Sequence, residues 1–127
     1  MTYAGAPPSV RPWLLALEWD SVRGAAREVE LMPLGELEWI LELPLWWRDG
    51  RPFRLKPRDV LREPERFAAQ HARMLEADLA RPVDVVHHLG RWVTVDGVNR
   101  LLKASALGHT AVAMREAPLA AVRALAA

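Results

Sequence analysis

The chain has 127 residues, 51% of them hydrophobic and 26% charged, which is typical of one globular domain with its own core and excludes the disordered class. Seventeen basic residues stand against sixteen acidic ones, so the net charge of +1 gives no overall field that attracts nucleic acid or an anionic membrane. The absence of cysteine excludes disulfides, thiolate metal sites and cysteine nucleophiles.

The N-terminal third predicts a leader, a helix, a strand and a helical turn. Residues 1–12 contain three prolines and no periodicity, which indicates a flexible leader. Apolar residues at helical spacing predict an amphipathic helix over 13–22. The alternation of polar and apolar residues over 28–31 predicts a half-buried strand, and the apolar spacing in 36–43 favours a short helical segment against the core.

The middle of the sequence predicts a hairpin followed by two helices. Residues 44–47 lead into a turn whose Asp49–Gly50 pair suits the positive φ angles of a tight hairpin turn. Prolines then open a short helix over 57–62 and a longer amphipathic helix over 64–79.

The C-terminal part predicts a second hairpin, a helix and a closing strand. In order, the expected elements are strands 83–87 and 92–95, a helix over 98–107 ended by Gly108, a strand over 111–115 and a short helix from Pro118 to the C-terminus. The fold class is therefore α+β, a small mixed sheet with a β-hairpin and packed helices. Residues 13–127 are expected to form a single domain.

The sequence contains neither of the two signals that would direct it to a membrane or out of the cell. It has no 18-residue apolar run, and its first residues lack the basic-then-apolar order of a signal peptide. We therefore expect a cytoplasmic protein with no membrane partner.

An aspartate-glycine pair, Asp96–Gly97, joins a predicted strand directly to the next helix. The first turn of a helix has unpaired N–H groups and a partial positive charge, so this junction is typical of an anion-binding site. Asp96 is expected to cap the helix and Gly97 to let a ligand approach the backbone. Arg100 can reach the same anion, with Lys103 the next nearest cation. The same spacing also fits a capped helix with a solvated arginine.

A wider pattern surrounds this junction. A proline-initiated strand at 82–86, a strand-glycine-arginine-helix run at 90–104 and a Leu-Gly turn with a closing strand at 107–115 follow one another. This order resembles the core of the ParB/sulfiredoxin-like superfamily, whose N-terminal ParB domains share it. The best-matched core is 82–117, and a looser match extends over 28–117.

The resemblance implies that Gly97, Asn99 and Arg100 contact the phosphates of a nucleotide. Val98 stands where sulfiredoxin-like members carry a reactive cysteine, so reduction of sulfinic acids is not expected. The resulting hypothesis is a domain that binds a phosphate-bearing ligand, best a nucleotide accompanied by Mg²⁺. The sequence does not identify its specific role.

A first alternative is a small-molecule phosphotransferase or a nuclease-like enzyme, and the sequence leaves catalysis undecided. Some ParB-like proteins are small-molecule kinases in which a carboxylate after the first strand accepts the substrate's hydroxyl proton. Glu38 is the residue of this chain that would occupy such a position, and an exposed glutamate on a helix is the alternative interpretation. An enzyme of this kind would also need a divalent ion, and Asp78 and Asp96 are the other candidate acids.

Two further side chains are candidates to line a ligand cleft. His71 and Arg73 lie on the predicted 64–79 helix, which borders the ligand turn in the resembling fold. His71 also falls on the apolar face, where a hydrogen-bonded core histidine is expected. No metal-ligand spacing connects the four histidines, so no metal site is predicted.

A second alternative is a DNA-binding or protein-interaction module without catalysis. Trp46 and Trp47 stand next to Arg48 and Arg51, a combination that suits base stacking. Neighbouring residues on a strand point to opposite faces, so at most one tryptophan belongs to the core. Core packing and interface burial are the competing explanations, and a homodimer is left open.

Overall fold

The computed structural model describes residues 7–9 and 28–116. The strands are β1 (Val29–Pro33), β2 (Trp46–Arg48), β3 (Arg51–Leu55), β4 (Val83–His88), β5 (Arg91–Asp96) and β6 (Ala111–Glu116). The helices are the 3-10 segments η4 (Leu34–Glu36) and η5 (Glu38–Glu42), followed by α1 (Pro57–Arg62), α2 (Ala68–Glu76) and α3 (Val98–Ala106). The predicted helices at 13–22 and from Pro118, and most of the leader 1–12, lie outside the described residues.

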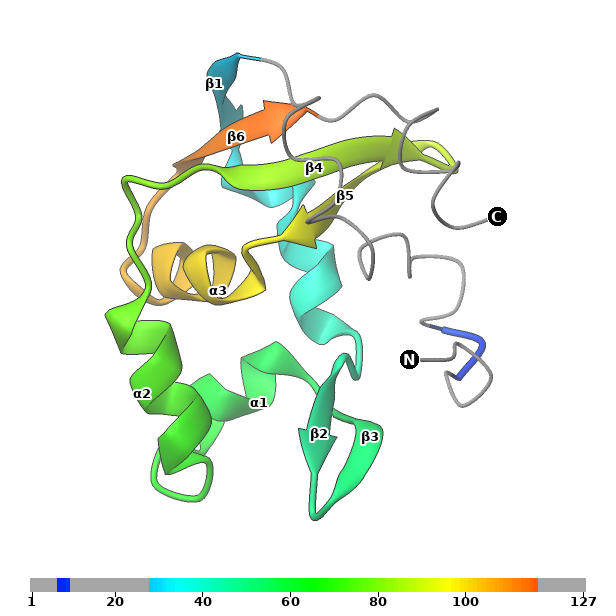
Figure 1. Ribbon diagram of the computed structural model, residues 1–127, viewed down its shortest axis with the longest axis vertical. Helices are drawn as coiled ribbons and strands as arrows, with labels where there is room; N and C mark the ends of the chain where they lie inside the picture. The colour runs from blue at the N-terminus through cyan, green and yellow to red at the C-terminus, as the bar shows by residue number, and fades with distance from the viewer. Residues whose placement is uncertain (1–6, 10–27, 117–127) are drawn as a thin grey trace.

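Four strands form a mixed sheet in the order β1-β6-β4-β5. β4 pairs antiparallel with β5 and parallel with β6, and β1 pairs antiparallel with β6. The hairpin of β2 and β3 is a separate sheet. In Figure 1, α3 lies beneath the four-stranded sheet, with α1, α2 and the hairpin farther from it. The predicted α+β class with a mixed sheet and a hairpin is confirmed.

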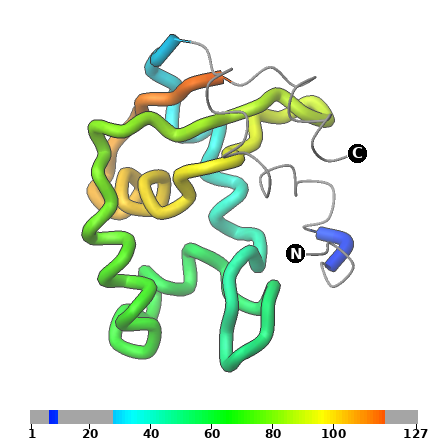
Figure 2. The backbone as a smooth tube through the Cα atoms, in the orientation of Figure 1, coloured from blue at the N-terminus to red at the C-terminus, as the bar shows by residue number. Residues whose placement is uncertain are grey.

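The β4–β5 hairpin begins and ends at the same end of the sheet. Figure 2 follows the chain from α2 up into β4, along the β4–β5 hairpin and directly into α3. Since β4 and β5 are antiparallel, with Asp84 opposite Asp96, the start of β4 lies beside the end of β5. The segment after α2 is therefore brought next to the start of α3.

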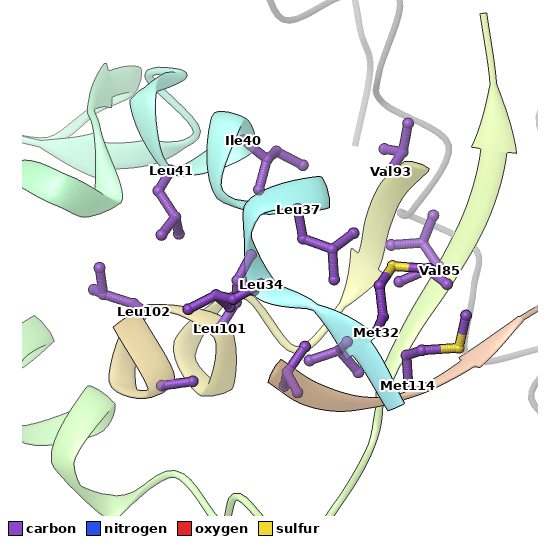
Figure 3. Packing of buried hydrophobic residues seen from close by; sticks show 14 of the residues in the cluster. Met32, Leu34, Leu37, Ile40, Leu41, Val85, Val93, Leu101, Leu102 and Met114 are labelled. Carbon is purple, nitrogen blue, oxygen red and sulfur yellow. The ribbon is translucent and has the colours of Figure 1, made fainter. Parts of the chain in front are cut away.

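The core lies between the sheet, α3 and the two 3-10 segments. Figure 3 shows Leu34 and Leu37, from the stretch that forms these segments, facing α3 and the sheet. The residues with the largest side chains that are fully buried are Leu37, Leu41, Leu55, Met74, Leu101 and Leu102. Burying each leucine stabilises the fold by about 1.5 to 3 kcal/mol. The apolar stripes predicted for 36–43 and 98–107 thus supply much of the core.

Helix α2 (Ala68–Glu76) is shorter than the helix predicted over 64–79. Residues 64–67 form a turn before α2, and Ala77 adopts an extended backbone after it. The Oδ1 atom of Asp78 then accepts a hydrogen bond from the Ala80 amide at 2.9 Å. Such a side-chain turn competes with the next helical turn, which the apolar spacing alone does not reveal.

The β2–β3 hairpin has the predicted tight turn. Asp49 and Gly50 have φ angles of +52° and +74°, as two-residue turns of type I′ require. Trp46 packs partly buried against the core, whereas Trp47 is 59% exposed. This division follows from the alternation of side chains along a strand.

None of the helices in the described part of the chain has both the length and the apolar composition needed to cross a bilayer.

One ion pair ties the sheet together internally. Asp84 on β4 is only 1% exposed, and both Nε and Nη2 of Arg115 on β6 lie 3.0 Å from its Oδ1. A buried carboxylate without a partner is strongly destabilising. This pair therefore holds β6 in register beside β4.

We predict that Arg115→Met lowers the free energy of unfolding by about 3 kcal/mol, because it leaves a buried charge uncompensated. Urea denaturation of the full chain measures the loss. Arg62→Met is the matched control, since Arg62 pairs with Asp59 on the exposed surface and should cost less than about 1 kcal/mol. Equal losses in the two variants would contradict a structural role for the Asp84–Arg115 pair.

Candidate functional site

The junction between β5 and α3 is built around Gly97. This glycine is the N-cap of α3, with φ +105°, and it has no side chain with which to cap the helix. The N-cap position thus falls on Gly97, whereas Asp96, the residue expected there, is the last residue of β5. The first-turn amides of Val98 and Asn99 have no partner within the helix by its geometry. The helix start keeps its partial positive charge.

Arg100 folds back over this junction. Its Nη1 donates a hydrogen bond to the carbonyl of Pro82, and its Nη2 lies 3.7 Å from Oδ2 of Asp96. The side chain is 14% exposed. The guanidinium thus connects the segment before β4 with the end of β5. It binds these two protein groups rather than pointing into open solvent.

Gly97 is required by packing. A Cβ atom at this position would lie 2.9 Å from Cγ1 of Val83 and 3.2 Å from Cζ of Arg100. Real side chains do not approach so closely, and φ +105° is itself unfavourable for any residue with a Cβ. Gly97 was expected to let a ligand approach the backbone. In the structure, the space beside it is filled by the side chains of Val83 and Arg100.

A surface pocket of about 490 Å³ lies at this junction, beside the end of α2. Its lining residues are Arg73, Glu76, Ala77, Asp78, Arg81, Val95, Asp96, Gly97, Val98, Asn99 and Arg100. We call it the α2–α3 pocket. It brings together five predicted site residues: Asp96, Gly97, Asn99, Arg100 and Arg73. The Oδ1 atom of Asn99 is buried and has no hydrogen-bond partner among the described residues.

The pocket is lined by three arginines and three carboxylates. Some of these charged groups already bind other protein groups among the described residues, and others do not. Asp96 and Arg100 face each other, and Asp78 accepts the amide of Ala80. Arg73 and Arg81 are exposed, and their guanidinium groups make no hydrogen bond or ion pair in residues 7–9 and 28–116. These two arginines are therefore the cations available to a ligand.

Two predicted site residues lie away from the pocket lining. Lys103 donates hydrogen bonds to the carbonyls of Leu75 and Ala77 at 2.7 and 2.8 Å, and so satisfies carbonyls that end α2. His71 is partly buried on α2 and is not among the lining residues. Of His71 and Arg73, the two residues predicted to line a cleft, Arg73 borders the pocket and His71 does not.

Glu38 lies in a different cluster, between η5, α1 and α3. Its Oε2 atom is 3.2 Å from Nη2 of Arg58 and accepts a hydrogen bond from Ser105 at 3.4 Å. Arg58 also donates to Ser105 at 2.8 Å. The carboxylate predicted as a general base therefore joins three elements, and it does not line the α2–α3 pocket.

Arg81 and Glu76 are charged lining residues that the sequence analysis did not select, and Arg81 could have been found. It precedes β4, whose first residues lie beside the end of β5. The predicted antiparallel hairpin already carried this information, because the residue before the first strand must come close to the residue after the second. Among the described residues, no group of three or more His, Asp or Glu side chains is placed to hold a metal ion.

No family model matches the sequence, and no curated protein or solved structure is significantly similar to it. Function is therefore inferred from the physical chemistry of the α2–α3 pocket.

We predict that Gly97→Ala costs about 3 kcal/mol of unfolding free energy, because it adds a close contact with Val83 to an unfavourable φ. Gly108→Ala is the matched control, with φ +76° but open space around the added Cβ, and should cost about 1 to 2 kcal/mol. Urea unfolding of both variants measures the difference. An equal cost would mean that packing at the β5–α3 junction is not tight.

Proposed function

We propose that this chain is a ParB/sulfiredoxin-like domain that binds a phosphate-bearing ligand, a nucleotide, in the α2–α3 pocket. One observation carries the proposal: the start of α3, with glycine as its N-cap, lies in a pocket also lined by two arginines that have no ion-pair partner among the described residues. Backbone amides and guanidinium groups are the two kinds of donor that proteins most often direct at phosphate.

The expected binding mode divides the work between helix and side chains. The amides of Val98 and Asn99 would donate to one phosphate, helped by the partial positive charge at the start of α3. Arg73 and Arg81, from the end of α2 and the segment before β4, would donate to the same or the next phosphate. Arg100 supports this arrangement by holding Pro82 and Asp96 at the junction.

The carboxylates at the pocket favour a ligand that brings its own cation. Glu76, Asp78 and Asp96 line the pocket together with the arginines, so a bare polyphosphate would meet repulsion as well as attraction. Mg²⁺ is commonly held by one or two carboxylates plus the phosphates of its substrate. A magnesium-nucleotide complex would suit this mixed lining better than free phosphate.

The pocket's size favours a ligand larger than a phosphate group. A volume of about 490 Å³ falls in the range of small-molecule sites. A pocket of this size has room for a ribose and a base beside the phosphates.

The proposal is for binding, and it assigns no catalytic base. Glu38 is already engaged by Arg58 and Ser105 and does not border the pocket. The phosphotransferase alternative would need another carboxylate near the ligand's terminal phosphate.

We predict that a magnesium-nucleotide raises the melting temperature of the full chain by several degrees. Ligand at 100-fold above its Kd stabilises the folded state by about 2.7 kcal/mol. The double variant Arg73→Gln/Arg81→Gln should melt normally without ligand, since both side chains are exposed and make no ion pair with any described residue. It should lose most of the ligand-induced shift. A thermal-shift screen of nucleotides with and without Mg²⁺ provides the measurement.

The control variant is Arg62→Gln, which changes an exposed arginine far from the pocket lining and should keep the full shift. A melting temperature unchanged by every nucleotide would refute the proposal. So would a shift that the Arg73→Gln/Arg81→Gln variant retains in full, because the ligand would then bind elsewhere.

A further inference from the structure

A second basic surface surrounds the β2–β3 hairpin and is separate from the α2–α3 pocket. We call it the hairpin surface and define it by Arg48, Trp47, Arg51, Arg54 and Arg66. Two adjoining pockets lie on it, one of about 460 Å³ lined by the hairpin arginines and Asp49, and one of about 290 Å³ between the hairpin and the start of α2. In Figure 1 the hairpin lies at the end of the molecule away from the four-stranded sheet.

The charge on the hairpin is poorly compensated. Arg48 and Arg51 are direct cross-strand partners, and like charges in that position repel. Asp49 lies 3.6 Å from Arg48, whereas Arg51 and Arg54 are exposed and have no ion-pair partner within the described ranges. An external anion would relieve this repulsion.

Two arginines from different segments converge on one aromatic ring. The Cζ atom of Arg48 lies 5.8 Å from the ring centre of Phe67, and that of Arg66 lies 5.3 Å from it. Cation–π contacts of this kind orient the guanidinium groups. The positive charge is thereby held beside the smaller pocket, which Arg48, Arg66 and Phe67 all line.

The smaller pocket also offers features that recognise a flat ring. Trp47 lines it and is 59% exposed, which is unusual for so large an apolar side chain. An exposed indole face beside the arginines suits stacking on a nucleobase.

From these observations we propose that the hairpin surface binds single-stranded nucleic acid. Trp47 stacks on an unpaired base, and the guanidinium groups of Arg51 and Arg54 contact the flanking phosphates, whereas Arg66 is already paired with Glu63. Stacking on an exposed tryptophan requires a base that is not already stacked in a duplex. An acidic peptide would use the arginines but would give Trp47 no base on which to stack.

The test is fluorescence anisotropy of a labelled single strand of about 20 nucleotides of mixed sequence, titrated with the full chain at several salt concentrations. Trp47→Ala should weaken binding about tenfold or more. Arg51→Gln/Arg54→Gln should also reduce the slope of log K against log salt by about 0.7 for each phosphate that the variant no longer neutralises. These positions are exposed, so circular dichroism should show the variants folded.

Two variants serve as controls. Leu89→Ala removes another exposed apolar side chain, at the β4–β5 turn, and should leave affinity unchanged. Arg73→Gln/Arg81→Gln should also leave it unchanged, which separates this surface from the nucleotide site proposed above. The inference is overturned if the strand does not bind at low salt, or if a duplex of the same sequence binds as tightly. It is equally overturned if polyglutamate binds as tightly as the strand, or if Trp47→Ala has no effect.

Discussion

The guanidinium of Arg100 is the interaction on which the candidate site depends. It bonds to the carbonyl of Pro82 and faces the carboxylate of Asp96, so it joins the segment before β4 to the end of β5. Gly97 is compatible with this clamp because it has no Cβ to collide with Val83 or the guanidinium. The start of α3 is thereby fixed beside the end of α2, with its first amides at the pocket.

The sequence predicted this junction well because its signals are local. A strand, a glycine and an apolar helical stripe follow one another, and each is a short-range pattern. The Asp49–Gly50 dipeptide predicted the hairpin turn equally well, since few residue types adopt positive φ angles at two adjacent positions. Helix α2 was overextended because the Asp78 turn that follows it depends on a side-chain hydrogen bond.

What the sequence could not show is which polar groups already have partners. Lys103 and Glu38 were candidates by residue type and position, yet Lys103 binds the carbonyls at the end of α2 and Glu38 binds Arg58. Both partnerships join segments far apart in the chain, and no periodicity encodes them. Arg73 and Arg81 gain importance for the opposite reason, because they line the pocket and no described residue pairs with them. A net charge of +1 thus conceals local sites of positive charge.

The central claim is that the first amides of α3 receive an anion. A titration of the ¹⁵N-labelled chain with a magnesium-nucleotide, followed by amide NMR, tests this most directly. The account predicts saturable shifts that are largest at Gly97, Val98 and Asn99, together with the side-chain Nε–H signals of Arg73 and Arg81. Saturable shifts confined to other parts of the chain, or no shifts at millimolar nucleotide, would contradict it.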